Sequence, residues 1–308
     1  MGFQNPHLKK ISHEVEYLAV RVASFVLFRV PRTWALGWGD FLGWLGFSVL
    51  RIRRKWVLFS LNRVFEGDKS PAELNRIGLR AYQNFCKSMI EFALLSEMSV
   101  TELHQRVKWD HLERLKAAVN AGHGVIVVTG HFGSWEMLAA SAAAHGLPAS
   151  VVADRMHNRK VDALITAMRT KYGCEVIQTH QSIRDFMRAL RRGRILALLS
   201  DQDSRKSTVF VNFLGLPAAT PAGAATLSLK TKAPILPVLI VRQADNRHIV
   251  YVEPEIEYTP SGNREQDVFQ ITQQFTQVIE RYIRQYPEQW FWMHHRWKRQ
   301  PKKSEHEG

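Results

Sequence analysis

The chain has 308 residues, of which 45% are hydrophobic, enough to bury a sizeable core, and this excludes disorder of the whole chain. Lys and Arg number 42 against 28 Asp and Glu, so the formal net charge is +14 and anionic partners are favoured, whether nucleic acid, anionic lipid or an acidic protein. The two cysteines, Cys86 and Cys174, stand far apart without metal-ligand spacing and give neither a disulfide framework nor a zinc site.

The first 56 residues are the most apolar part of the chain, with Trp34, Trp38 and Trp44 close together. The longest stretches without a charge, 22–28 and 41–50, are well short of the ~18 to 20 residues that span a bilayer. A transmembrane helix is therefore not required.

Residues 15–26 carry apolar side chains at helical spacing, and Arg21 and Arg29 lie off that stripe, as in a helix that lies in a membrane interface. In residues 1–60, nine basic residues minus three acidic ones leave a net charge of +6, which anionic headgroups attract. No small-residue cleavage site follows a clean apolar stretch, so we expect an uncleaved segment facing a reducing cytoplasm. The sequence predicts a membrane-associating helical region at 1–56. The alternative is a soluble helical hairpin, for which several exposed tryptophans would be unusual.

The rest of the chain predicts an α/β domain at 57–298, which begins with a helical prelude at 57–120, and a basic polar tail at 299–308. From residue 124 onward, apolar β-branched runs alternate with helical patterns. This alternation is typical of an α/β fold with a mixed central sheet layered with helices. We expect strands at 125–128, 151–152, 195–199, 235–241 and 249–258, and helices at 135–145, 161–171, 183–192, 222–232 and 266–286. Thr220 and Pro221 predict a capped start for the helix at 222–232.

The strongest candidate for a catalytic site follows the strand at 125–128. There the sequence reads Thr-Gly-His-Phe-Gly-Ser-Trp-Glu at 129–136, and an alanine-rich helix comes next. His131 thus falls at the carboxyl end of a strand, where α/β sheets bind ligands. Residues five apart in one helix point about 140° away from each other, so we expect His131 in a loop permitted by Gly130 and Gly133. Glu136, in a first helical turn that Ser134 can cap, could then reach back to it.

Such a pair suits proton transfer. A carboxylate on one imidazole nitrogen fixes the tautomer, and the other nitrogen can take a proton from a hydroxyl. No Gly-x-Ser-x-Gly nucleophile elbow is present, which favours direct attack by an acceptor hydroxyl. The spacing alone does not separate a catalytic pair from a histidine that merely ends a strand. No third His or Cys stands at ligand spacing near His131, so we expect no metal.

Several segments together resemble a known family. The His-x4-Glu at 131–136 resembles the motif of glycerolipid-type acyltransferases, and the chain around it resembles the bacterial lipid A biosynthesis acyltransferases of the late, lauroyl and myristoyl type. The resemblance extends over most of the sequence, with four motifs in the right order. Its other matching pieces are 54–66, 199–203, 209–223 and 286–298.

The resemblance implies roles for particular residues. His131 would be the general base that activates an acceptor hydroxyl, with Glu136 as its orienting partner and an acyl thioester carbonyl as the electrophile. Arg169 would bind a phosphate or stabilise the oxyanion, a task suited to a guanidinium. Asp201 ends the strand at 195–200 at the ligand-binding edge of the sheet. Asp203 and Arg155 would join the site, although the family's Tyr-Arg-Pro piece stands here as Asp-Arg-Met at 154–156.

The resemblance also implies partners. The donor would be an acyl carrier protein or acyl-CoA, and the acceptor an anionic glycolipid at the cytoplasmic face of the bacterial inner membrane. No cofactor is implied. Open alternatives are acylation of another glycolipid or aminolipid from acyl-CoA, as in phosphatidylinositol mannosides, and a membrane scaffold with a vestigial His-Glu pair. The charge and the basic cluster at 51–55 suggest a nucleic-acid-binding protein, but the basic residues are scattered and no binding module is recognisable, so we expect no nucleic-acid partner.

Overall fold

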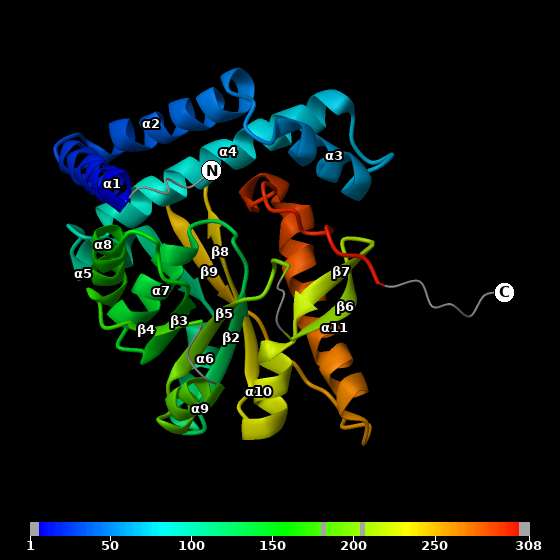
Figure 1. Ribbon diagram of the computed structural model, residues 1–308. Helices are drawn as coiled ribbons and strands as arrows, with labels where there is room; N and C mark the ends of the chain where they lie inside the picture. The colour runs from blue at the N-terminus through cyan, green and yellow to red at the C-terminus, as the bar shows by residue number, and fades with distance from the viewer. Residues whose placement is uncertain (1–5, 180–182, 204–206, 302–308) are drawn as a thin grey trace.

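The computed structural model describes residues 6–179, 183–203 and 207–301. Most of the expected tail, 302–308, lies outside this range. Figure 1 shows a central sheet with helices on both faces and further helices across one end. The expected α/β class is therefore found.

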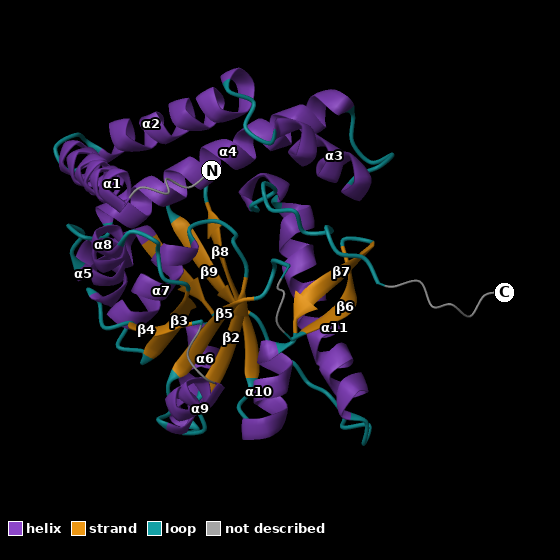
Figure 2. Cartoon of the chain, viewed as in Figure 1, coloured by secondary structure: helices purple, strands orange, loops and turns teal. Residues whose placement is uncertain are grey.

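Seven of the strands in the described residues form one sheet in the order β1-β9-β8-β2-β5-β3-β4, and the remaining two form a hairpin (Figure 2). All neighbours in the sheet are parallel except β8 and β9, which makes the sheet mixed as expected. The sheet strands are β1 (Val107–Asp110), β2 (Val125–Thr129), β3 (Ala149–Ala153), β4 (Glu175–Gln178), β5 (Ile195–Leu199), β8 (Ile235–Arg242) and β9 (His248–Val252); the hairpin strands are β6 (Thr208–Phe213) and β7 (Leu216–Pro221).

The centre of the sheet is apolar on both faces, since every residue of β2 and β8 is buried. Side chains alternate across a strand, so Ile126 and Val128 belong to one core cluster and Val125 and Val127 to the other. Helices α9 (Ile183–Arg191), α10 (Gly223–Thr231) and α11 (Arg264–Gln285) pack on the first side. Helices α5 (Val100–Arg106), α6 (Leu112–Asn120), α7 (Trp135–Ala144) and α8 (Arg159–Thr170) pack on the second.

The N-terminal helices lie across the end of the sheet at the top of Figure 1. They are α1 (Pro6–Leu27), α2 (Arg32–Trp44) with a π-helical turn, η1 (Leu45–Val49), then α3 (Arg54–Val64) and α4 (Pro71–Leu94). Helix α4 lies in the expected helical prelude and starts at Pro71, where Ser70 and Glu73 form a capping box. Helix α2 lies close to α4: a Cβ added at Gly43 would stand 2.5 Å from the Gln83 backbone.

Some expected elements differ from the structure. Thr220 and Pro221 do not start a helix, because they pair with Val209 and Thr208 in the β6–β7 hairpin; α10 begins only at Gly223. The strand expected at 249–258 ends at Val252, shortly before a proline that lacks a backbone donor. Strands β1, β4, β6 and β7 were not expected, and β1 interrupts the region 57–120 that was expected to be helical.

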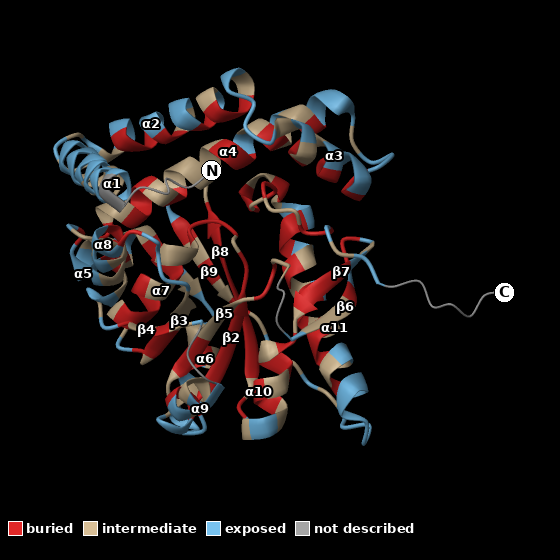
Figure 3. Ribbon diagram, viewed as in Figure 1, coloured by how far each residue is buried: buried red, intermediate tan, exposed pale blue. Residues whose placement is uncertain are grey.

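Much of the N-terminal helices is exposed on the side away from the sheet (Figure 3), and many of the exposed residues are large and hydrophobic. Of the twenty exposed large hydrophobic residues in the described chain, sixteen lie between Leu8 and Phe59. Trp34 is 67% exposed and Trp38 54% exposed. In the same described residues, no helix combines the length and apolarity needed to cross a membrane. The N-terminal helices therefore have an outer side, rich in large hydrophobic residues, that the rest of the described chain does not cover.

Candidate active site

The loop between β2 and α7 places His131 as the sequence predicts. Strand β2 ends at Thr129, His131 lies in the following loop, and Glu136 lies in the first turn of α7. Gly133 adopts φ +55°, and a Cβ there would stand 2.1 Å from the Ile240 carbonyl oxygen, so this position requires glycine. Ser134 occupies the N-cap position, but its side chain makes no capping bond, contrary to expectation.

The carboxylate that contacts His131 belongs to Asp201. Its Oδ1 lies 2.9 Å from His131 Nδ1, and its Oδ2 accepts the His131 backbone N–H at 2.8 Å. Asp201 follows β5, the strand beside β2, so both residues stand at the same edge of the sheet. The Asp201 side chain is fully buried, whereas that of His131 is 22% exposed. An imidazole that donates from Nδ1 leaves Nε2 as an acceptor.

Asp201 is ionised in this setting. Burial alone would raise its pKa, but the neighbouring His131 and the hydrogen bonds from His131 and Trp290 outweigh burial and lower the pKa below the usual range. The Trp290 indole Nε1 donates to Oδ2 at 2.8 Å. Sequence reasoning used the segment 286–298 for family resemblance but did not single out Trp290. An isolated antiparallel bridge between Phe132 and Trp290 brings this segment to the site.

Glu136 does not bind His131 and pairs with Arg169 instead, which corrects the expected His131–Glu136 contact. Arg169 donates from Nε to Oε2 at 3.0 Å and from Nη2 to Oε1 at 2.5 Å. Both side chains are largely buried, at 11% exposed for Glu136 and 20% for Arg169. Burial would lower the pKa of Arg169, but the hydrogen bond and charge of Glu136 raise it. A bidentate pair of this kind holds the guanidinium in one orientation.

An apolar cavity opens beside this ion pair, between α7 and the sheet. Its volume is about 70 Å³. Glu136, Arg169, Thr129 and Trp135 contribute to its lining, and the Trp135 ring centroid lies 5.3 Å from that of His131. Much of the remaining lining is small and apolar: Ala139, Ala142, Ala149, Ala153 and Ala197. The small side chains of α7 and of the sheet therefore leave this cavity between them.

The other two expected site residues are placed differently. Asp203 receives a bond from Arg299 Nε at 2.8 Å, and its backbone N–H donates to His294 Nε2 at 3.1 Å. Asp203 thus anchors the C-terminal segment close to His131 and Asp201. Arg155 is exposed in the loop after β3, and within the described residues it has no hydrogen bond or ion pair. Burial lowers the pKa of His294 to about 4, so this histidine, which the sequence analysis did not select, is neutral.

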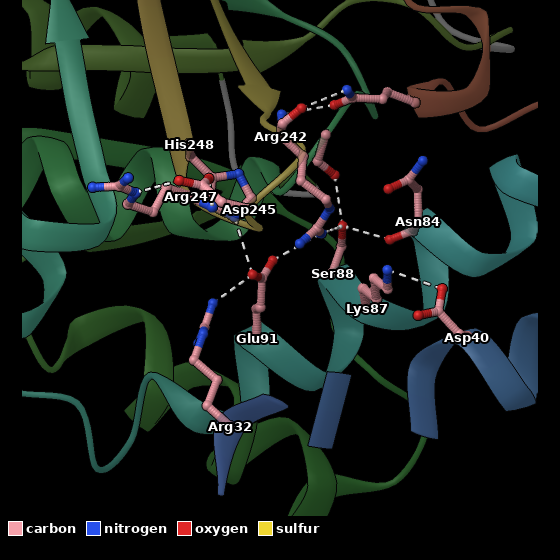
Figure 4. A network of polar contacts seen from close by, with 12 residues as sticks. Arg32, Asp40, Asn84, Lys87, Ser88, Glu91, Arg242, Asp245, Arg247 and His248 are labelled. Carbon is pink, nitrogen blue, oxygen red and sulfur yellow. Dashed lines mark hydrogen bonds and ion pairs between the residues drawn. The ribbon is translucent and has the colours of Figure 1, made fainter. Parts of the chain in front are cut away.

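A buried ionic network holds the His131 loop from the side of α4 (Figure 4). Glu91 is fully buried and pairs with Arg32 of α2, with Arg242 of β8 and with His248 of β9. Arg242 Nη2 also donates to the Ser88 hydroxyl at 3.0 Å, and this hydroxyl lies 2.8 Å from the Gly133 carbonyl oxygen.

The network therefore links the first helices to the His131 loop. Burial would raise the pKa of Glu91, but the charges of His248, Arg242 and Arg32 hold it well below the usual range.

Comparison with known proteins gives a consistent assignment. The family described as bacterial lipid A biosynthesis acyltransferase matches residues 4–299. A phosphatidylinositol mannoside acyltransferase of Mycolicibacterium smegmatis (strain ATCC 700084 / mc(2)155) is 26% identical over 74% of this chain and 73% of its own length. A lipid A biosynthesis palmitoleoyltransferase of Escherichia coli (strain K12) is 30% identical over 63% of each chain. The lipid A biosynthesis myristoyltransferase of the same strain is 23% identical over 83% of this chain and 77% of its own length. The protein is therefore an acyltransferase and belongs to the bacterial lipid A biosynthesis acyltransferase family.

Proposed function

We propose that this acyltransferase moves a fatty acyl chain from a thioester donor to a hydroxyl group of a lipid A precursor or a related glycolipid. The observation that carries the proposal is the Asp201 carboxylate on Nδ1 of His131, whose ring contacts Trp135 in the lining of an apolar cavity. An acyl transfer needs a base for the acceptor hydroxyl and a dry, apolar space for the chain, and both stand side by side.

In the proposed mechanism, His131 Nε2 takes the proton of the acceptor hydroxyl as the oxygen attacks the thioester carbonyl. Asp201 holds the imidazole in the required tautomer and stabilises the imidazolium that forms. The resulting tetrahedral oxyanion collapses, the carbon–sulfur bond breaks, and the imidazolium returns the proton to the departing thiolate. The products are an ester and a free thiol, with the base restored.

Arg169 is the residue that we propose binds a negatively charged group near the base. Glu136 engages its Nε and Nη2, which fixes the orientation of the guanidinium in the cavity lining. From there it stabilises the oxyanion or a phosphate of the acceptor. Glu136 then acts as the residue that positions Arg169, a role different from orienting His131.

The cavity between α7 and the sheet is the proposed acyl site. Its lining is dominated by apolar side chains, and burial of each methylene contributes about 0.8 kcal/mol. The alanines of α7 and the sheet line the narrow cavity that the acyl chain would enter. The thioester carbonyl would then remain at the polar mouth, near Trp135 and Glu136.

The outward apolar surface of the N-terminal helices supports docking to the cytoplasmic face of the bacterial inner membrane. Trp34 and Trp38 suit an interface, and the basic residues of 51–55 suit anionic headgroups. Helices that lie in the membrane plane need not be long enough to cross it. The net charge of +14 also favours association with an acidic acyl carrier protein as donor.

A second candidate follows from the mycobacterial relative, which is named a phosphatidylinositol mannoside acyltransferase and aligns over 74% of this chain. In this alternative the acceptor is a mannoside lipid or an aminolipid and the donor is acyl-CoA. The proposed base, ion pair and cavity serve either acceptor, so the chemistry at His131 is the same.

The test uses the full-length protein in detergent with a lipid A precursor, and with either an acyl carrier protein thioester or acyl-CoA. We expect transfer with the first donor and its loss in His131→Ala, while His123→Ala, at an exposed histidine, keeps its rate. Near-normal turnover by His131→Ala would contradict the mechanism. Mass spectrometry of lipids from a deletion strain, showing which lipid lacks an acyl group, decides between the two acceptors.

A further inference from the structure

A second group of potential ligands lies away from His131, where α1 meets the loop before α8. His13 and Glu16 project from α1 at a spacing of three residues, which places them on one face of the helix. His157 comes from the loop that precedes α8. One donor atom from each side chain lies within 4.8 Å of the other two.

The geometry points to a site for a divalent transition-metal ion of the Zn²⁺ class, bound by His13, Glu16 and His157, which fastens α1 to α8. Two imidazoles and one carboxylate suit Zn²⁺, Co²⁺ or Ni²⁺, whereas Ca²⁺ and Mg²⁺ prefer oxygen ligands alone. The role is independent of the acyl-transfer mechanism.

The distances fit this class of ion. Ligands on a tetrahedral zinc ion, with bonds near 2.0–2.1 Å, stand ~3.3 Å apart. His157 Nε2 and Glu16 Oε2 are already 3.3 Å apart. The rings of His13 and His157 meet edge to face, with centroids at 5.3 Å and an angle of 61°, and a nitrogen of each lies within 4.8 Å of the other and of a Glu16 oxygen. The fourth position opens into a surface hollow, which supplies an entry path and room for water.

The site also has supporting contacts around its ligands. Asn158 is buried, and its Oδ1 caps α8 by accepting the backbone N–H groups of Lys160 and Val161. Its Nδ2 is thereby aimed at α1, where it donates to Glu16 Oε2 at 3.1 Å and to the His13 carbonyl oxygen at 2.7 Å. These bonds fix the carboxylate ligand, as outer-shell partners do in metal sites.

The charges around the hollow are mixed. Lys9, Lys10 and Arg159 line it and oppose a cation, but Lys160, the nearest lysine in sequence to His157, is engaged by Glu14 at 2.7 Å. We therefore expect one ion per chain, bound reversibly.

An ion here would hold the helix whose outer face carries Val15, Leu18 and Val22, all more than half exposed. Its other anchor is α8, the helix that presents Arg169 to the cavity at its far end. The metal would thus keep the apolar surface of α1 in a fixed position relative to the ion pair of the active site.

Binding is tested on the full-length protein in detergent after chelator treatment. Titration with Co²⁺ should give the visible absorption of a low-symmetry site at one ion per chain, and Zn²⁺ should displace it. His13→Gln and His157→Gln should each weaken binding at least about tenfold, while His123→Gln, at an exposed histidine outside the group, should bind like wild type. No binding by wild type, or equal binding by His157→Gln, overturns the proposal.

The fastening role has its own measurement. Trypsin cleavage after Arg29, in the turn between α1 and α2, should be slowed severalfold by Zn²⁺ in wild type and His123→Gln but not in His13→Gln or His157→Gln. Inorganic phosphate without metal serves as the control for an anion in the lysine-lined hollow. Equal cleavage with and without Zn²⁺, or protection by phosphate alone, overturns the role of the metal.

Discussion

The indole Nε1 of Trp290 donates a 2.8 Å hydrogen bond to the same Asp201 oxygen that accepts the backbone N–H of His131. The other carboxylate oxygen is left for the imidazole, so the carboxylate is fixed from two directions. The orientation of the proposed base thus depends on the turn after β2, the end of β5 and the segment after α11.

Replacement of Trp290 by Phe keeps an aromatic ring but removes this donor. A hydrogen bond to a charged group contributes about 1.5–3 kcal/mol, so we expect kcat to fall about 10- to 100-fold with little change in the KM of the acceptor. Trp292→Phe is the matched control, because Trp292 is equally buried but donates to the Pro287 carbonyl oxygen. Equal kinetics for the two variants would show that Asp201 does not need the indole.

Glu136→Gln should leave the His131 tautomer unchanged, because Glu136 bonds to Arg169 and Asp201 bonds to the imidazole. ¹⁵N chemical shifts of a histidine-labelled protein report which ring nitrogen carries the proton. We expect the Nδ1-protonated form of His131 in wild type and in Glu136→Gln. A switch to the other tautomer in Glu136→Gln would mean that Glu136 controls the base after all.

The sequence could place His131 and Asp201 at one edge of the sheet, because both follow apolar β-branched runs. The sequence could not predict that His131 contacts Asp201, because the two residues are 70 positions apart and no local pattern indicates that β5 lies beside β2. The contact between Glu136 and His131 was expected because the two residues are only five positions apart in the sequence. The helical turn instead aims Glu136 at Arg169, 33 positions away. The sequence could not predict that Trp290 lies in the site, because an isolated bridge without strand periodicity brings it there.

Chain-length selectivity should respond to bulk in the cavity. Ala142→Leu adds a branched side chain to the lining, so we expect the preferred acyl donor to become shorter. Each methylene that is excluded costs about 0.8 kcal/mol, or about fourfold in kcat/KM. Competition among thioesters of graded length measures this preference.

Ala117→Leu, on the exposed side of α6, is the control and should keep the wild-type preference. An unchanged preference in Ala142→Leu would place the acyl chain elsewhere.

Glu91 makes the stability of the fold dependent on pH. Its pKa in the folded protein lies below the ordinary value of 4.5, so its stabilisation is present above that pH and is lost as the pH falls through the folded value. Glu91→Gln leaves Arg242 buried without its partner and should lower the free energy of unfolding at neutral pH by about 3–5 kcal/mol.

Urea unfolding at graded pH measures both effects. The free energy of unfolding of Glu91→Gln should fall less steeply toward acid than that of wild type, because the titrating group is gone. Glu97→Gln, at an exposed position three residues beyond the end of α4, should follow the wild-type curve. Parallel curves for wild type and Glu91→Gln would contradict the assignment.

The most direct test of the central claim is the kcat/KM of Asp201→Asn with an acyl thioester and a lipid hydroxyl acceptor. An amide in place of the carboxylate favours the wrong tautomer of His131 and leaves the imidazolium without its counter-charge. A comparable change in a Ser-His-Asp enzyme lowers kcat about 10⁴-fold. We predict a fall of about 10³- to 10⁴-fold in a protein that remains folded. A folded Asp201→Asn variant with a near-wild-type kcat/KM would contradict the account.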